Sequence, residues 1–224
     1  MLLFHMNMHV HAYRFHSAPA KQAAARALLA ITDRGWVGVD LFFVLSGFLI
    51  TRILVDARTS TNYYRVFYAR RALRIFPLYF SVLVLGLVVV PSLAHITSAG
   101  YTSAVQHQWY LWTYCSNIGS SFGVEFGPFS HFWSLAVEEH FYLLWPFLVR
   151  ISPPKRLAPI CIVCIFGALV ARLALIHAGL PVAAGWLTPS RVDAFGFGGL
   201  AAVVADGVTN TKWRRLFGRA IFAI

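Results

Sequence analysis

Charged residues are scarce in this 224-residue sequence, at 12% of the chain, and only eight residues are Asp or Glu. A soluble domain carries about twice that share of charge. Hydrophobic residues make up 58% of the chain, aromatic residues make up 16%, and the mean hydropathy is +0.65. The scarcity of charge therefore excludes an ordinary soluble domain and favours a membrane protein.

Cysteine is also scarce, with three residues in the chain, so no disulfide framework is predicted. Cys161 and Cys164 form a C-x-x-C pair inside an apolar run. Because no second pair and no flanking His accompany them, they favour small helix-packing residues over a metal or redox site. The histidines between positions 5 and 16 are irregularly spaced and lack an Asp or Cys to complete a set, so no metal site is predicted.

Several long apolar runs approach the roughly 20 residues that a membrane-spanning helix needs. They are residues 36–51, 75–90, 132–149, 159–176 and 194–205. One such run would also suit a buried core helix, but five in a chain of this length indicate a polytopic membrane protein. We therefore expect an all-α fold, a transmembrane helix bundle in a lipid bilayer.

Basic residues alternate with these runs. Thirteen of the nineteen Lys and Arg fall in three stretches, 52–74, 150–156 and 212–219, and each stretch follows an apolar run. Residues 92–130 contain no Lys or Arg. The positive-inside rule predicts that the basic stretches are cytoplasmic and that 92–130 is extracytoplasmic. The net charge of +11 is therefore attributed to basic residues that set the membrane topology, and no nucleic-acid partner is predicted.

The outer stretch 92–130 has to begin and end on the same side, so it contains either no crossing or an even number. Its aromatic part, 105–117, is short, which favours an interfacial or re-entrant segment. Trp109, Tyr110 and Trp112 suit either stacking on a sugar or an interfacial aromatic belt. Pro91 is expected to close the preceding helix, because proline interrupts the hydrogen bonding of a helix.

Arginines gather at the start of the predicted crossing 75–90. Arg71 and Arg74 are three residues apart, so they share one face of a helix at its cytoplasmic edge. Such a pair suits either topology-setting charges that reach lipid phosphates or a clamp for the phosphates of a cofactor. The sequence leaves both interpretations open.

Two carboxylates lie inside the run 132–149, where ionisable groups are costly and usually functional. Ser134, Glu138 and Tyr142 recur every four residues and so form one polar stripe, while Glu139 points about 100° away. Glu138 lies about 7 to 8 Å inside the apolar zone from its outer end. It suits either a structural ion pair with an arginine such as Arg191 or a catalytic carboxylate.

Four segments, in this order, resemble motifs of the membrane-bound acyltransferase 3 family of bacterial O-acyltransferases. They are GWVGVDLFFVLSGFLIT (35–51), RRALRIFPLYF (70–80), HFWSLAVEEHFYLLWP (131–146) and RVDAFGFGGLAA (191–202). The resemblance implies a single transmembrane acyltransferase domain over residues 1–224, with about 6 to 8 of the roughly ten membrane segments of the family. It also implies a fragment that lacks the start of the first helix and the C-terminal helices.

The resemblance also implies site residues. His5 and Glu138 correspond to catalytic residues, and His5 would act either as the base on the acceptor hydroxyl or as the acyl carrier. Arg71 and Arg74 correspond to ligands of the phosphates of an acyl-CoA donor. The other residues of the family motifs are Asp40, Ser46, Trp133, Ser134, Tyr142, Arg191 and Asp193.

The predicted function is an O-acyltransferase that moves an acyl group, usually acetyl from acetyl-CoA, to a hydroxyl of an envelope carbohydrate or a related acceptor. The predicted location is the inner (cytoplasmic) membrane of a bacterial cell, which the protein crosses several times. Two alternatives stay open: a transporter or channel whose Arg and Glu side chains line a pathway, and a truncated acyltransferase without activity.

Overall fold

A computed structural model describes residues 35–93 and 98–208 of the chain. Within these ranges the chain is helical and contains no β-strand, which confirms the all-α prediction. Two compact units make up the chain, residues 1–43 and 44–224, and only residues 35–43 of the first are described. These residues form the first turns of helix α3 (Gly35–Asp56).

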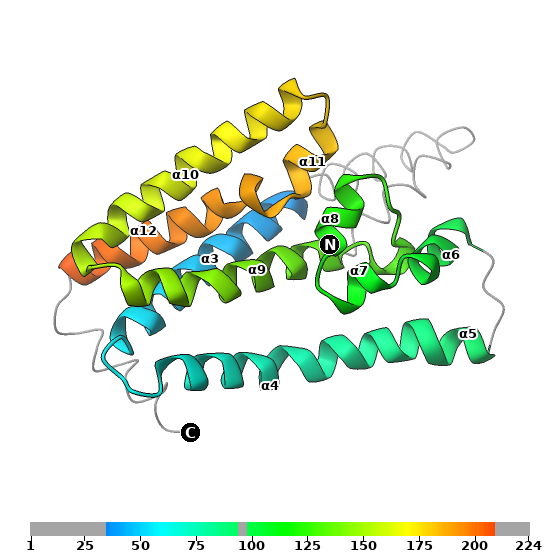
Figure 1. Cartoon of the computed structure of the whole chain (residues 1–224), viewed down its shortest axis with the longest axis horizontal. Helices are drawn as coiled ribbons and strands as arrows, with labels where there is room; N and C mark the ends of the chain where they lie inside the picture. Colours follow the sequence, from blue (N-terminus) through cyan, green and yellow to red (C-terminus); the bar gives the residue numbers. More distant parts are fainter. Residues whose placement is uncertain (1–34, 94–97, 209–224) are drawn as a thin grey trace, which may run out of the picture. The chain divides into compact units, whose positions relative to one another are not determined.

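The described residues form five long helices joined by short ones (Figure 1). The long helices after α3 are α4 (Tyr63–Val84), α9 (Phe132–Ile151), α10 (Pro154–His177) and α12 (Val192–Val208). The short ones are α5 (Val90–Leu93), α6 (Ala99–Gln106), α7 (Trp109–Trp112), α8 (Ser116–Ser121) and α11 (Pro181–Trp186). Two 3-10 turns, Gly127–Phe129 and Thr188–Ser190, precede α9 and α12.

Three of the described helices are long and apolar enough to cross a membrane: Trp36–Asp56, Tyr63–Leu93 and Pro154–His177. α12 adds a shorter apolar helix, Val192–Ala205. α9 carries the expected crossing 132–149 but is not among the three, because polar side chains interrupt its apolar surface. These helices support a multi-pass membrane protein.

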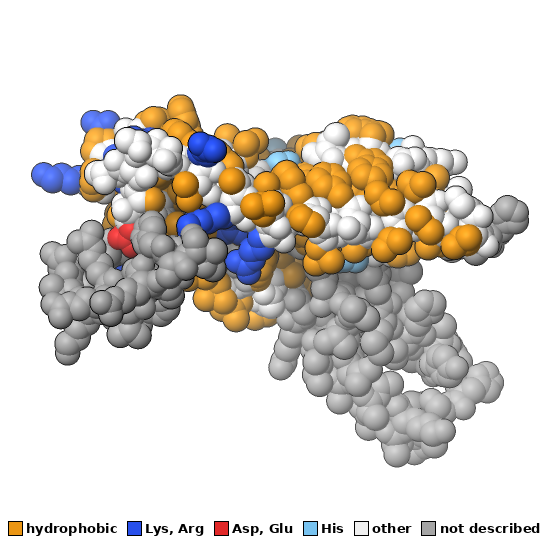
Figure 2. Space-filling view, turned by 90° about the horizontal axis from the view of Figure 1, so that it is seen from below, with side chains coloured by type: hydrophobic (Ala, Val, Ile, Leu, Met, Phe, Trp, Pro, Cys, Tyr) orange, Lys and Arg blue, Asp and Glu red, His pale blue; other side chains and the backbone are white. Residues whose placement is uncertain are grey.

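The outward surface of α4 is apolar. Figure 2 faces the side on which α4 lies and shows hydrophobic side chains spread over it, with Lys and Arg gathered in one part. The large hydrophobic residues of α4 that are exposed in this way include Leu73, Phe76, Leu78, Val82 and Val84. Because water would disfavour such a surface and lipid would not, it fits a helix that crosses a bilayer.

The helix of the predicted crossing 75–90 is longer than expected, since it extends over Tyr63–Leu93. The prediction that Pro91 closes it is wrong. A π-helical turn at Leu85–Val89 has i to i+5 spacing, which pairs the Gly86 carbonyl with position 91, where proline has no N–H. The Tyr101 hydroxyl donates to the Gly86 carbonyl oxygen instead, at 2.5 Å, so the helix continues through the proline.

Helices α3, α10 and α12 lie side by side in Figure 1 and pack through small residues. A Cβ on Gly198 of α12 would overlap the carbonyl oxygen of Val44 and lie 2.6 Å from the backbone nitrogen of Phe48. The backbones of α12 and α3 are therefore in direct contact, as in other membrane helix pairs. Gly199 faces the buried Cys161 of α10, in agreement with a packing role for that cysteine.

Residues 98–131 pack along the second half of α4. Their short helices and the two neighbouring long helices share one buried cluster: Tyr79, Leu83, Leu87, Tyr101, Ala104, Leu111, Phe126, Phe129 and Phe132. The longest helix described in this stretch, α6, has eight residues, which is too short to span a bilayer. The arrangement therefore fits the predicted interfacial or re-entrant segment.

This segment changes the expected depth of Glu138. The rings of Tyr79 and Phe132 are 4.9 Å apart, so α9 begins beside the middle of the Tyr63–Leu93 helix. That helix continues for the fourteen residues 80–93, which span about 21 Å at 1.5 Å per residue. Residues 98–131 occupy this level. With the predicted topology, in which Leu93 marks the outer end of that helix, Glu138 lies deeper than the about 7 to 8 Å that counting along α9 alone predicts.

The contact between α3 and α12 predicts that a Gly→Ala substitution destabilises the protein at Gly198 but not at Gly167. Gly198→Ala should lower the midpoint of thermal unfolding in detergent by about 3 to 10 °C, because the added methyl group overpacks the helix contact. Gly167→Ala on α10 is the matched control, since a Cβ there meets no atom within 4 Å, and it should leave the midpoint unchanged or raise it. Equal shifts for both variants would contradict the packing described here.

Candidate active site

Glu138 is buried between α9 and α3, with 7% of its surface exposed. The Ser46 hydroxyl of α3 donates to Glu138 Oε1 at 2.9 Å, and the Tyr142 hydroxyl donates to the same oxygen. The hydroxyl oxygens of Ser46 and Tyr142 are 3.2 Å apart. Together the three side chains form a closed polar triangle, which compensates the burial of the carboxylate.

The predicted stripe on α9 is confirmed. Ser134, Glu138 and Tyr142 are all buried, one helical turn apart. The Ser134 hydroxyl donates to the backbone carbonyl of His131 at 3.1 Å, so this buried hydroxyl has a partner within its own helix end. Within the stripe, Ser134 therefore bonds to the backbone and Tyr142 bonds to the Glu138 carboxylate.

Arg71 of α4 lies against this triangle. Its Cζ is 3.6 Å from the centre of the Tyr142 ring, a close cation–π contact. The guanidinium also interacts electrostatically with Glu138 and Glu139. Arg74, by contrast, is exposed. The structure thus brings Arg71 to Glu138 and leaves Arg74 at the surface.

The motif residues at the start of α12 lie in a second group. Asp193 forms an ion pair with Arg172 of α10 at 2.7 Å, and Arg172 also donates to the Ser190 carbonyl at 2.7 Å. Arg191 lies over the Trp133 ring, with its Cζ 5.6 Å from the centre. Asp193 therefore joins the start of α12 to α10. The role of Arg172 was not predicted, although a single charge within the apolar run 159–176 was a usable signal.

A third polar group connects the outer segment to α9. The Thr188 hydroxyl contacts His140 Nδ1 at 2.7 Å and accepts from Asn117 Nδ2 at 3.0 Å. The backbone of Tyr114 is a further hydrogen-bond partner of His140. These contacts hold α8 against α9 and the turn before α12. None of these residues was predicted from the sequence, because nothing in their spacing marks them as neighbours.

The remaining predicted site residues are His5 and Asp40. His5 lies outside the described residues. Asp40 lies in the first turns of α3, within the first unit. In residues 35–93 and 98–208, no group of three or more His, Cys, Asp or Glu could hold a metal ion.

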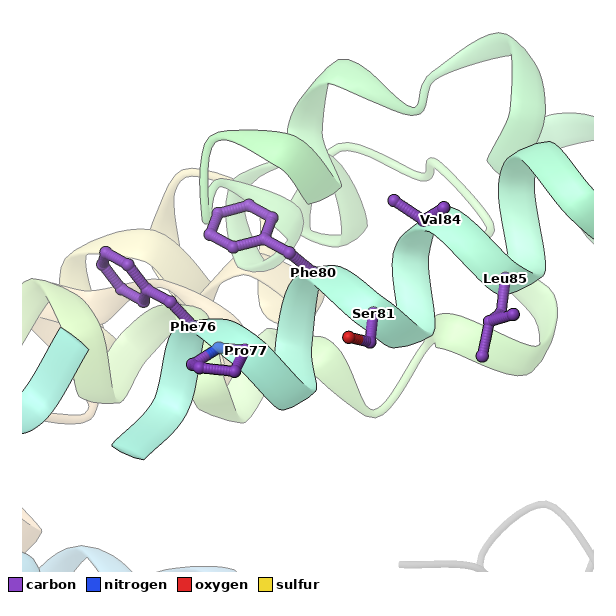
Figure 3. A pocket seen from close by; sticks show the side chains of 6 residues that line it. All are labelled: Phe76, Pro77, Phe80, Ser81, Val84 and Leu85. Atoms are coloured by element: carbon purple, nitrogen blue, oxygen red, sulfur yellow. The ribbon is translucent and has the colours of Figure 1, made fainter. Parts of the chain in front are cut away.

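A groove on α4 lies apart from the carboxylate. Its lining comes from α4 and its extension: Phe76, Pro77, Phe80, Ser81, Val84 and Leu85. Figure 3 shows Phe76 and Phe80 projecting from the same side of the helix. With a single hydroxyl among apolar side chains, the groove offers contact for hydrocarbon chains and no group for acid–base chemistry.

Known proteins match the chain over a small part of their own length. The peptidoglycan O-acetyltransferase OatA of Listeria monocytogenes is 35% identical over 146 residues, which are 57% of this chain and 22% of the relative. The O-acetyltransferase OatA of Staphylococcus aureus is 35% identical over 128 residues, 51% of this chain and 20% of the relative. The chain thus spans about a fifth of the length of these relatives. No solved structure matches it.

The match to a family covers almost the whole chain. The family model described as an acyltransferase domain matches residues 6–224. This range contains the four motif segments and the buried Ser46–Glu138–Tyr142 triangle. The chain therefore belongs to the acyltransferase 3 family.

Proposed function

We propose that the chain takes part in O-acetylation at the membrane, with acetyl-CoA as donor and a hydroxyl of peptidoglycan or a similar envelope carbohydrate as acceptor. The observation that carries the proposal is the buried Glu138, fixed by two hydroxyl donors and flanked by Arg71. The peptidoglycan acceptor is suggested by the name of the Listeria relative. The inner membrane is the proposed location, because it faces both cytoplasmic acetyl-CoA and the envelope.

Glu138 is proposed to orient and stabilise the base. In the transfer, the acceptor oxygen attacks the thioester carbonyl, its proton goes to the base, and the CoA sulfur leaves. His5 is the proposed base, and a neighbouring buried carboxylate would hold its imidazole and stabilise the imidazolium that forms.

Arg74 and Arg71 are proposed to receive the CoA moiety. The helix Tyr63–Leu93 has 31 residues and is about 46 Å long, while the hydrocarbon core is about 30 Å thick. If Leu93 is level with the outer edge of the core, the arginines lie near its inner edge, where cytoplasmic phosphates arrive. The exposed Arg74 suits the phosphates, and Arg71, about one turn away on α4, contacts the Tyr142 ring of the triangle.

Replacing Glu138 tests the proposed chemistry. Glu138→Gln should lower kcat for label transfer from radioactive acetyl-CoA to peptidoglycan in membranes by about 10²- to 10⁴-fold, because the imidazole loses its stabilising charge. The KM for acetyl-CoA should stay within about twofold, since the donor is held elsewhere. Glu125→Gln, at an exposed carboxylate, is the control and should transfer normally. A normal rate for Glu138→Gln would refute the assignment.

Replacing Arg74 tests the donor site. Arg74→Gln should raise the KM for acetyl-CoA about tenfold with little change in kcat, because a phosphate contact contributes about 1.4 kcal/mol or more. Raising the ionic strength should reduce the difference in the KM for acetyl-CoA between this variant and the unmodified chain. Arg65→Gln, another exposed arginine of α4, is the control. Equal KM values for the two variants would exclude a specific role for Arg74.

A further inference from the structure

Glu139 lies on a different side of α9 from Glu138, because consecutive residues of a helix point about 100° apart. Its Oε1 is buried and has no hydrogen-bond partner among the described residues. Its charge acts on Tyr79 of α4 and on Tyr114 of the outer segment, and Arg71 attracts it. A buried carboxylate oxygen without a hydrogen-bond donor is costly. Packing alone therefore does not explain why Glu139 is buried here.

Tyr114 faces the same region in a strained conformation. Its φ is +56°, a left-handed backbone that side chains other than those of glycine, asparagine and aspartate rarely adopt. The Tyr114 ring stacks on Tyr79, with ring centres 4.1 Å apart, and contacts Phe76 and Phe80. Figure 3 shows these two phenylalanines projecting from α4 on the side of the short helices. Such strain persists only where the surroundings enforce it, and it gathers at functional sites.

The Tyr114 hydroxyl is an unused donor. Its oxygen is buried and finds no partner in the part of the chain that the structure describes. Burial, and then the charge of Glu139, raise the pKa of Tyr114 above its ordinary value, so the phenol keeps its proton at neutral pH. Tyr114 therefore has an O–H without a partner, and Glu139, whose charge acts on Tyr114, has a carboxylate oxygen without one.

An alcohol can bond to both kinds of group. A carboxylate accepts hydrogen bonds, a phenol donates one, and an alcohol does both through one oxygen. The adjoining Ser116 and Asn117 are almost fully buried. Ser116 Oγ and Asn117 Oδ1 also lack partners among the described residues, as expected where a ligand with several hydroxyls binds.

We propose that Glu139 and Tyr114 bind the acceptor hydroxyl and present it beside Glu138. This inference rests on the proposed function. Arg71 interacts electrostatically with both Glu138 and Glu139, so the two carboxylates lie near the same arginine although they point to different sides of α9. Tyr114 belongs to the outer segment, the side from which an envelope carbohydrate arrives, and the Thr188 contacts of His140 and Asn117 hold that segment against α9.

The test uses the chain in lipid nanodiscs, with soluble, un-cross-linked peptidoglycan strands as the probe and radioactive acetyl-CoA as the donor. Tyr114→Phe removes one oxygen and keeps the ring stack, and Glu139→Gln removes the charge and keeps the shape. Each should weaken strand binding and raise the KM for strands about five- to tenfold, the effect of one lost hydrogen bond. The KM for acetyl-CoA should not change.

Tyr64→Phe and Glu125→Gln are matched controls, since both side chains are exposed, and they should bind strands normally. Thermal unfolding midpoints show whether each variant keeps its fold. If the unmodified chain transfers acetyl and both site variants keep its KM for strands, the inference is wrong, the two groups hold only water, and the proposed function stands.

Binding separates the remaining outcomes. If the unmodified chain binds strands without transferring acetyl, the proposed function fails, and weaker binding by the two variants still supports the acceptor site. Normal binding by the variants in that case overturns the acceptor site as well. If the unmodified chain neither binds strands nor transfers acetyl, both proposals are overturned.

Discussion

The site depends on one constraint, the burial of the Glu138 carboxylate inside a helix bundle. A carboxylate in such surroundings is tolerated only where hydrogen bonds replace water. Ser46 and Tyr142 supply these hydrogen bonds from α3 and from the next turn of α9. Arg71 of α4 lies over the Tyr142 ring. Three helices are thus oriented toward one another by a single acid.

The surrounding helices make this arrangement rigid and asymmetric. Backbone contact at Gly198 holds α12 against α3, while the Arg172–Asp193 pair joins α12 to α10. On the other side, residues 98–131 pack along the outer half of α4. The carboxylate therefore has arginines toward the predicted cytoplasmic side and the polar side chains of the outer segment toward the other, as the proposed transfer from a cytoplasmic donor to an outer acceptor requires.

The sequence predicted the features that follow from helical period and composition. The stripe Ser134–Glu138–Tyr142 followed from spacing alone, and the family resemblance added Ser46. Contacts between distant segments were not predictable, as the pairing of Arg172 with Asp193 shows. Pro91 was misjudged, because the Tyr101 hydroxyl that replaces its missing N–H lies in another helix. Tyr114 carried no signal, since its residue type gives no indication of the positive φ that it adopts.

The central claim is that Ser46 and Tyr142 act on Glu138 as one unit, and a double-mutant cycle tests it directly. The rates of acetyl transfer would be measured for Ser46→Ala, Tyr142→Phe and the double variant, each at saturating acetyl-CoA. Because both hydroxyls donate to the same carboxylate oxygen, the double variant should be only slightly slower than the slower single variant. The coupling free energy between the two substitutions should be about 1 kcal/mol or more. Single effects that multiply in the double variant would contradict the shared site.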